Sequence, residues 1–184
     1  DDARIHFASK GGGHAVKALS FNDVDGDNIP DEFFRVPKTL GPGAYSFSAW
    51  WKPRFPKAYT INTYTNQFPL FGSSGTPWQL LKLRLQSGQI TYAAQLKASN
   101  NSVHGASVSI PHADHPWQTW HHLVFSQDGT GYTMYVDGIH QSNFASWPTG
   151  LTAMPINSFD IPRIYTSPID ITNFTIWDKA LDSA

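Results

Sequence analysis

The sequence predicts an all-β protein built as an antiparallel β-sandwich, and three observations support this class. Residues 117–138 read W-Q-T-W-H-H-L-V-F-S-Q-D-G-T-G-Y-T-M-Y-V-D-G, which is typical of two strands joined by a tight turn. Thirteen prolines and fourteen glycines are spread along the 184 residues and interrupt most windows in which a helix could run. Apolar residues make up 40% of the chain and charged residues 15%, a balance that suits two packed sheets.

The hairpin prediction depends on the spacing of the apolar side chains. In residues 120–126 and 132–136 they recur at every second position, the period of a strand with one buried face. The turn between them, residues 127–131, contains Asp128-Gly129 and Gly131, which we expect to supply positive φ angles. A second turn is predicted at Asp137-Gly138.

Other strands follow from short apolar runs bounded by glycine, proline, serine and asparagine. They are expected over residues 4–8, 33–36, 45–52, 68–71, 78–85, 89–96, 107–110, 158–164 and 169–177. Residues 45–52 are almost continuously apolar, which predicts a central strand that is covered on both faces. Residues 1–14, with three consecutive glycines, are expected to include a flexible connector.

The W-x-x-W-H-H-L-V-F run followed by Y-V-D-G resembles the signature hairpin of laminin G-like and pentraxin-like domains, within the concanavalin A-like lectin/glucanase group. Residues 18–21, 33–37 and 45–53 fit the same family in order, and residues 169–181 match its closing strand and short helical turn. The resemblance covers about residues 15–184. It implies one jelly-roll domain over residues 1–184 and an extracellular or cell-surface location.

Charge and hydropathy argue against two kinds of partner. The formal net charge is −1, so no broad basic field would attract nucleic acid. No apolar run approaches the roughly 20 residues that cross a bilayer, so membrane insertion is not expected. The chain begins at Asp1 without methionine, and we expect it to be a piece of a longer secreted or surface protein.

An acidic segment at residues 23–32 is the candidate metal site. Asp23, Asp25, Asp27 and Asp31 place hard oxygen ligands at a spacing that suits calcium. The run resembles a thrombospondin type 3 or EF-type loop, although Asn28 stands where those loops have glycine and Phe34 where an EF-type loop has glutamate. An ion-free acidic turn is the alternative, which repulsion among five carboxylates disfavours. We therefore predict calcium, either structural or in contact with ligand.

The residue inventory argues against catalysis and against a zinc site. A concanavalin A-like glycosidase needs two carboxyl groups beside the scissile bond, and Glu32 is the only glutamate. A polysaccharide lyase would need histidine, tyrosine and arginine to converge, for which Arg84, Tyr92 and His122 are candidates. His121 and His122 should point to opposite faces of a strand, so they do not form a zinc pair. We expect a protein that is not an enzyme.

Binding is the function that remains, because aromatic and amide side chains on long loops suit the faces and hydroxyls of sugars. We expect a calcium-dependent carbohydrate-binding or adhesion module. The alternative is a structural interaction domain that binds a peptide or a neighbouring protein domain. Trp50, Trp51, Trp120 and Trp177 are expected to be structural because they lie in or beside strands. The predicted ligand-binding residues are Tyr59, Tyr64, Asn66, Trp78, Gln79, Asn143 and Trp147.

Overall fold

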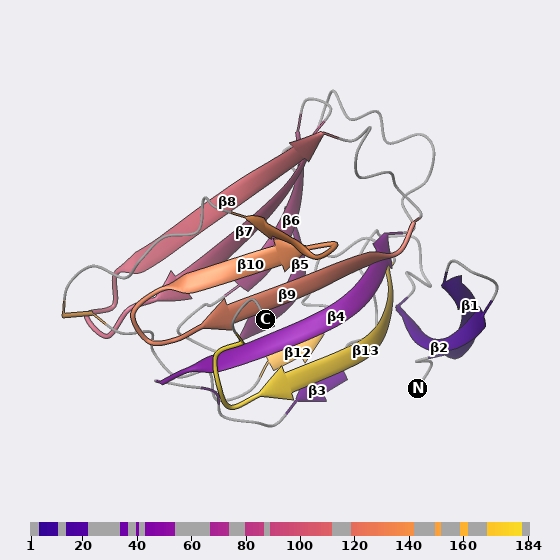
Figure 1. Ribbon diagram of the computed structural model, residues 1–184, viewed down its shortest axis with the longest axis horizontal. Helices are drawn as coiled ribbons and strands as arrows, with labels where there is room; N and C mark the ends of the chain where they lie inside the picture. The colour runs from indigo at the N-terminus through magenta and orange to yellow at the C-terminus, as the bar shows by residue number, and fades with distance from the viewer. Residues whose placement is uncertain are drawn as a thin grey trace.

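The computed structural model forms two β-sheets, one stacked behind the other (Figure 1). Every regular element in the described residues is a strand, and every pairing between them is antiparallel. The predicted antiparallel β-sandwich is therefore confirmed. The structure describes residues 4–10, 14–21, 34–36, 40, 43–53, 67–73, 80–86, 89–111, 119–141, 150–151, 159–161 and 169–181.

One sheet has seven strands in the order β1-β2-β13-β4-β9-β10-β11. Strand β4 lies at its centre, as the nearly continuous apolar run predicts. The bounds are β1 (Arg4–Lys10), β2 (His14–Phe21), β4 (Tyr45–Pro53), β9 (His121–Gln127), β10 (Tyr132–Val136), β11 (Ile139–Gln141) and β13 (Ile169–Trp177).

The other sheet has six strands in the order β3-β12-β5-β6-β7-β8. Late strands pair with early ones in both sheets, β13 with β2 and β4, and β12 with β3 and β5, as in a jelly roll. The bounds are β3 (Phe34–Val36), β5 (Gln67–Ser73), β6 (Leu80–Gln86), β7 (Gln89–Lys97), β8 (Val103–Pro111) and β12 (Phe159–Ile161).

Four local details differ from the sequence analysis. The strand expected over residues 4–8 is present as β1, but it pairs with β2 over residues 14–21, a strand that was not predicted, and the glycines of the expected connector lie outside the described residues. Strand β8 begins earlier than predicted, at Val103, and β11 was missed because three residues are too few to show a period. In the turn after β9, Gly129 has the expected positive φ, 91°, whereas the φ of Gly131 is not positive.

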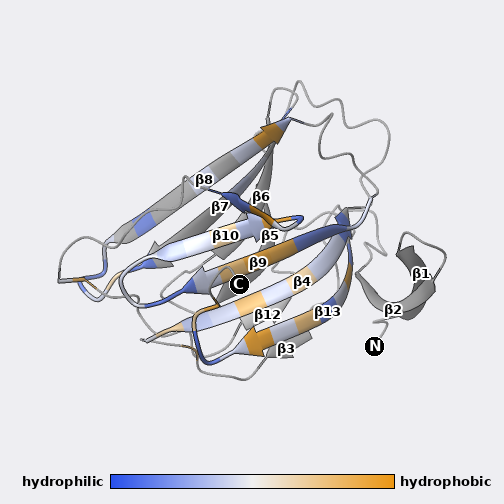
Figure 2. Ribbon diagram, viewed as in Figure 1, coloured by the Kyte–Doolittle hydropathy of each residue, from blue (hydrophilic) through white to orange (hydrophobic). Residues whose placement is uncertain are grey.

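The core lies between the sheets and is rich in stacked aromatic rings. On the inner face of the seven-stranded sheet, Phe125 contacts Phe47, Tyr45 and Tyr132 at ring-centroid distances of 5.1, 6.2 and 6.1 Å. Alternation along β9 and β10 produces this face, since every second residue is buried over most of each strand. The alternation is one of burial and not of hydropathy, since β9 has hydrophilic ends and a hydrophobic middle (Figure 2).

Trp51 joins the two sheets. It is completely buried in β4, and its ring meets Tyr92 of β7 edge-on at 5.7 Å and 83°. Tyr92 is equally buried, and it belongs to the six-stranded sheet. One aromatic pair thus spans the sandwich.

The hydroxyl of Tyr45 is buried without a hydrogen-bond partner among the described residues. Burial also raises the pKa of Tyr45. Because a buried hydroxyl that makes no hydrogen bond costs about 1–3 kcal/mol, Tyr45→Phe is expected to raise the free energy of unfolding by about 1 kcal/mol. Urea denaturation measures it, with Tyr135→Phe on the partly exposed outer face as control. A loss of more than about 1 kcal/mol would mean that an ordered water satisfies the hydroxyl.

The segment after β13 is fastened to the outer face of the seven-stranded sheet. Ser46 Oγ donates to the carbonyl of Lys179 at 2.8 Å, and the amide of Leu181 donates to Ser126 Oγ at 2.8 Å. Both serines are buried, and residues 179–181 accordingly lie over β4 and β9. The predicted helical turn at this point is wrong, because residues 178–181 are held as an irregular strap by these side-chain bonds.

Candidate functional site

All eleven site residues predicted from the sequence lie outside the described residues, so these predictions stay predictions. The ligand-binding set is Tyr59, Tyr64, Asn66, Trp78, Gln79, Asn143 and Trp147, and the metal set is Asp23, Asp25, Asp27 and Asp31. The strand ends that precede two of these segments are described. Phe21 and Pro53 both pair with Ile169, so β2 and β4 end on either side of the start of β13.

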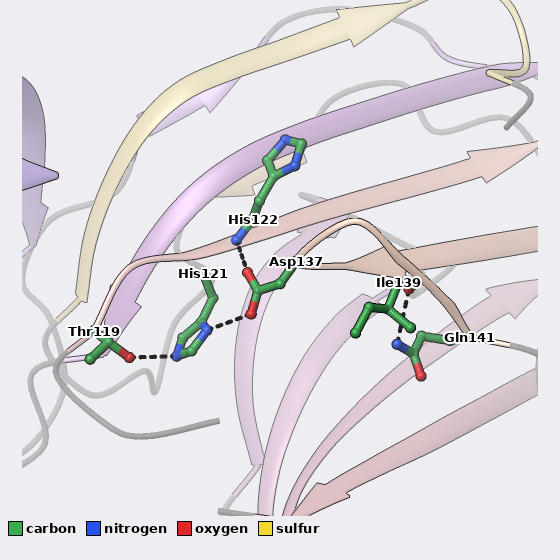
Figure 3. Close-up of polar contacts among 6 residues, drawn as sticks. All are labelled: Thr119, His121, His122, Asp137, Ile139 and Gln141. Atoms are coloured by element: carbon green, nitrogen blue, oxygen red, sulfur yellow. Dashed lines mark hydrogen bonds and ion pairs between the residues drawn. The ribbon is translucent and has the colours of Figure 1, made fainter. Parts of the chain in front are cut away.

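The turn at Asp137-Gly138 lies at this same end of the sheet (Figure 3). Asp137 and Gly138 have φ angles of 52° and 80°, which is the two-residue turn that the D-G pair predicts between β10 and β11. The backbone amide of Asp137 donates to the carbonyl of His122 at 2.8 Å. The turn is therefore tied to β9 as well as to its own strands.

The Asp137 carboxylate connects both histidines of the motif (Figure 3). Its Oδ1 accepts from the backbone amide of His122 at 2.7 Å, and its Oδ2 lies 2.8 Å from Nδ1 of the buried His121. Since a carboxylate only accepts, Nδ1 of His121 carries the proton in this bond. The other ring nitrogen, Nε2, lies 2.9 Å from the hydroxyl of Thr119. The H-H and D-G parts of the motif thus form one hydrogen-bonded unit.

The Asp137 charge also acts on the neighbouring sheet. Burial raises the pKa of Tyr92 well above its usual range, and the nearby Asp137 carboxylate adds to this effect. Tyr92 is therefore a neutral phenol at neutral pH, which argues against its use as a base in a lyase.

The outer face of the seven-stranded sheet carries an aromatic cluster next to this turn. Trp50 of β4 pairs with His122 of β9, and their rings stack at 5.0 Å and 22°. Lys52 lies two residues along on the same face, with Nζ 5.2 Å above the ring of Trp120. All four side chains are partly exposed. We call Trp50, Lys52, Trp120 and His122 the aromatic block.

A buried carboxylate borders the aromatic block on the β13 side. Asp170 of β13 pairs with Lys52 in register, and its Oδ2 lies 2.9 Å from Nζ of Lys52. Only 6% of the Asp170 side chain is exposed, so the lysine is held in place by a buried partner. The Asp137 carboxylate lies on the other side of β9, with the ring of His121 (Figure 3).

The tryptophans that were expected to be structural differ in burial. Trp51 is buried, whereas Trp50, Trp120 and Trp177 are partly exposed. The W-W pair already contained this information, because adjacent residues in a strand point to opposite faces.

Neither a metal site nor a lyase site forms from the described residues. They contain no group of three or more histidine, aspartate and glutamate side chains that could hold a metal ion. The lyase candidates do not converge. Arg84 pairs with Thr91, the neighbour of Tyr92, so Arg84 and Tyr92 lie at positions on opposite faces of the six-stranded sheet. His122 belongs to the seven-stranded sheet.

In the described ranges, no helix has the length and apolarity needed to cross a bilayer.

The turn after β9 yields a pH-dependent prediction. Partial burial alone would raise the pKa of Asp128, but hydrogen bonds from Thr130 and the Gly131 amide to Oδ1 lower it below its ordinary 3.8. Asp128→Ala should therefore cost about 1 kcal/mol at neutral pH. Because the folded pKa is depressed, this contribution is complete well above pH 3.8 and is lost as the pH falls through the folded pKa.

Urea denaturation of wild type and Asp128→Ala at about pH 7 and about pH 2 measures this contribution. The difference should shrink at the lower pH. If the difference in unfolding free energy between wild type and Asp128→Ala is the same at both pH values, the negative charge of Asp128 does not contribute to stability.

The fold and the topology define an antiparallel jelly-roll domain. A family model for the concanavalin A-like lectin/glucanases superfamily matches residues 31–184. The chain belongs to this superfamily, as the H-H and Y-V-D-G motifs suggest. No curated protein matches the chain in sequence.

Solved structures of toxin binding domains are similar to this chain. The binding domain of botulinum neurotoxin serotype G has 14% identity and a TM-score of 0.66, with 98% of this chain and 43% of that chain covered. The binding domain of Paraclostridial mosquitocidal protein 1 has 16% identity and a TM-score of 0.69, with 97% and 43% covered. The botulinum neurotoxin serotype D ligand-binding domain, solved in complex with N-acetylneuraminic acid, has 14% identity and a TM-score of 0.56, with 95% and 47% covered.

These similarities show the fold alone, because fewer than one residue in five is identical. The chain also spans less than half the length of each of these structures.

Proposed function

We propose that this chain is a non-catalytic carbohydrate-binding module of a larger secreted or cell-surface protein. The observation that carries the proposal is the aromatic block, where partly exposed tryptophan rings lie beside fixed charged groups. Aromatic faces stack on the C–H faces of sugar rings, and neighbouring polar groups bind the hydroxyls. Three similar structures are binding domains by name, which supports the same reading.

The absence of catalysis is part of the proposal. The chain has one glutamate, so the two-glutamate arrangement of a concanavalin A-like glycosidase has no source in this sequence. The test is incubation of the purified chain with a panel of polysaccharides, followed by chromatography of the products. We expect no release of oligosaccharides above buffer, and sustained release would overturn this part of the proposal.

Calcium in the segment containing Asp23, Asp25, Asp27 and Asp31 is a second part of the proposal. It is supported by the carboxylate spacing, which suits a cation that takes six to eight oxygens. Calorimetric titration of calcium into chelator-treated protein should give a binding isotherm that Asp25→Asn weakens at least tenfold. Asp182→Asn, a carboxylate outside the segment, is the control and should bind calcium as the wild type does.

A glycan array tests the function itself. Fluorescently labelled protein should bind a subset of glycans, and repeating the array with a chelator separates calcium-dependent from calcium-independent binding. Signals that disappear with the chelator and with Asp25→Asn would support calcium-dependent recognition. An array without any signal would contradict carbohydrate binding.

One observation favours a protein partner as the second candidate. Ile139 is 66% exposed on β11, the last strand in the order of the seven-stranded sheet. An exposed apolar side chain at a sheet edge is suited to contact with a peptide or a neighbouring domain. If the array gives no signal, and if the wild type binds a cell-surface protein that Ile139→Lys does not bind, this second function replaces the first.

A further inference from the structure

We propose that the aromatic block is the saccharide-contacting surface of this module, and that it takes an uncharged pyranose rather than an acidic sugar. This inference rests on the proposed carbohydrate-binding function and specifies its location and its ligand class. The block lies on the outer face of the sheet, between β13 and β10 (Figure 1). Its two tryptophans, Trp50 and Trp120, were expected to be structural.

The first argument is the arrangement of the rings. Trp50 and His122 form one stacked pair, and Lys52 and Trp120 form a second pair two residues along the strands. Two residues of a strand span about 6.6 Å, so the distance between the two aromatic positions along the strands is comparable to the size of one sugar ring. Tryptophan rings bury a large apolar area with few rotatable bonds, which favours binding to a flat and weakly apolar ligand face.

The second argument is that the block is held rigidly. Lys52 bonds to the buried carboxylate of Asp170 and lies over Trp120, so its position is set by two contacts. The amide of His122 bonds to Asp137, which also binds the buried ring of His121. A preformed surface loses little conformational entropy when a ligand binds.

The third argument is charge. The block contains one lysine, and Asp170 matches its charge at 2.9 Å. A carboxylated sugar would bring a further negative charge next to Asp170, whose carboxylate already matches Lys52, whereas a neutral pyranose adds no charge. The electrostatics therefore favour a neutral sugar over an anion.

The experiment combines a glycan array with tryptophan variants. The array carries neutral gluco-, galacto- and manno-oligosaccharides beside sialylated and uronic acid-containing ones, and the strongest soluble ligand is titrated by calorimetry. Trp50→Ala and Trp120→Ala should each weaken its binding at least tenfold. Trp177→Ala is the matched control, because Trp177 is also partly exposed on this sheet and pairs with Ser46 at the other end of β4. It should change the affinity less than twofold.

A second measurement does not depend on the variants folding. Adding the same oligosaccharide to isotopically labelled wild type should shift the indole N–H signals of Trp50 and Trp120 and leave that of Trp177 in place. Circular dichroism and thermal unfolding establish that each variant retains the wild-type fold before its affinity is interpreted.

The outcomes separate this inference from the proposed function. If the wild type binds no glycan, both fail. If it binds a glycan and Trp50→Ala and Trp120→Ala retain the affinity, with no shift of the two indole signals, the site lies elsewhere and only this inference fails. If binding is confined to sialylated or uronic acid-containing glycans, the assignment to uncharged sugars is wrong. Binding of neutral oligosaccharides that both variants abolish supports the whole inference.

Discussion

Replacing Trp51 with alanine is expected to lower the free energy of unfolding by about 3–5 kcal/mol, the typical cost of removing a large buried aromatic ring. Trp51 is completely buried, and it contacts Tyr92 of the opposite sheet and the ring of His121. Its loss would leave a cavity between the two sheets and release both neighbours. Equilibrium unfolding in urea, followed by circular dichroism, measures the change.

The neighbouring tryptophan provides the control for this prediction. Trp50→Ala removes the same side chain from the same strand, but from the partly exposed outer face. It should cost clearly less than Trp51→Ala, since less apolar area returns to water and no cavity forms. Equal losses for the two variants would contradict the assignment of Trp51 to the inside and Trp50 to the outside.

Replacing Asp137 with alanine is expected to lower the free energy of unfolding by about 2–4 kcal/mol, because two hydrogen-bond donors lose their acceptor together. These donors are the ring of the buried His121 and the backbone amide of His122. Alanine also fits the φ of 52° at this position less well than aspartate does. Thermal and urea unfolding measure the loss.

Asp137→Asn separates the charge of this side chain from its geometry. Asparagine accepts the left-handed backbone and keeps one acceptor oxygen, so about half of the loss should be recovered. If the asparagine variant is as unstable as the alanine variant, the ionic character of the contact with His121 dominates. If the alanine variant is as stable as wild type, the Asp137 network contributes nothing to the fold.

Much of the fold could be predicted because alternation is a local property of the sequence. The strands at 121–127, 132–136 and 169–177 were expected within one residue of their observed bounds. Strand β11 and the first part of β8 lacked a readable period.

The candidate site was much harder to predict than the strands. Sequence reasoning placed the binding residues on long loops and treated Trp120 as structural. The cross-strand contacts of Trp50 with His122 and of Lys52 with Asp170 join residues more than seventy positions apart. No local pattern reports such a contact, although the W-W pair did indicate that one indole must face outward.

The sequence by itself determined the class of fold, the Asp137-Gly138 turn and the family, because strand period and turn chemistry are properties of neighbouring residues. Only the tertiary structure decided that His121 is buried against Asp137 and that the partly exposed His122 stacks on Trp50. The physical reason is packing: adjacent residues of β9 point to opposite faces, and the face that the second sheet covers becomes core while the other meets solvent.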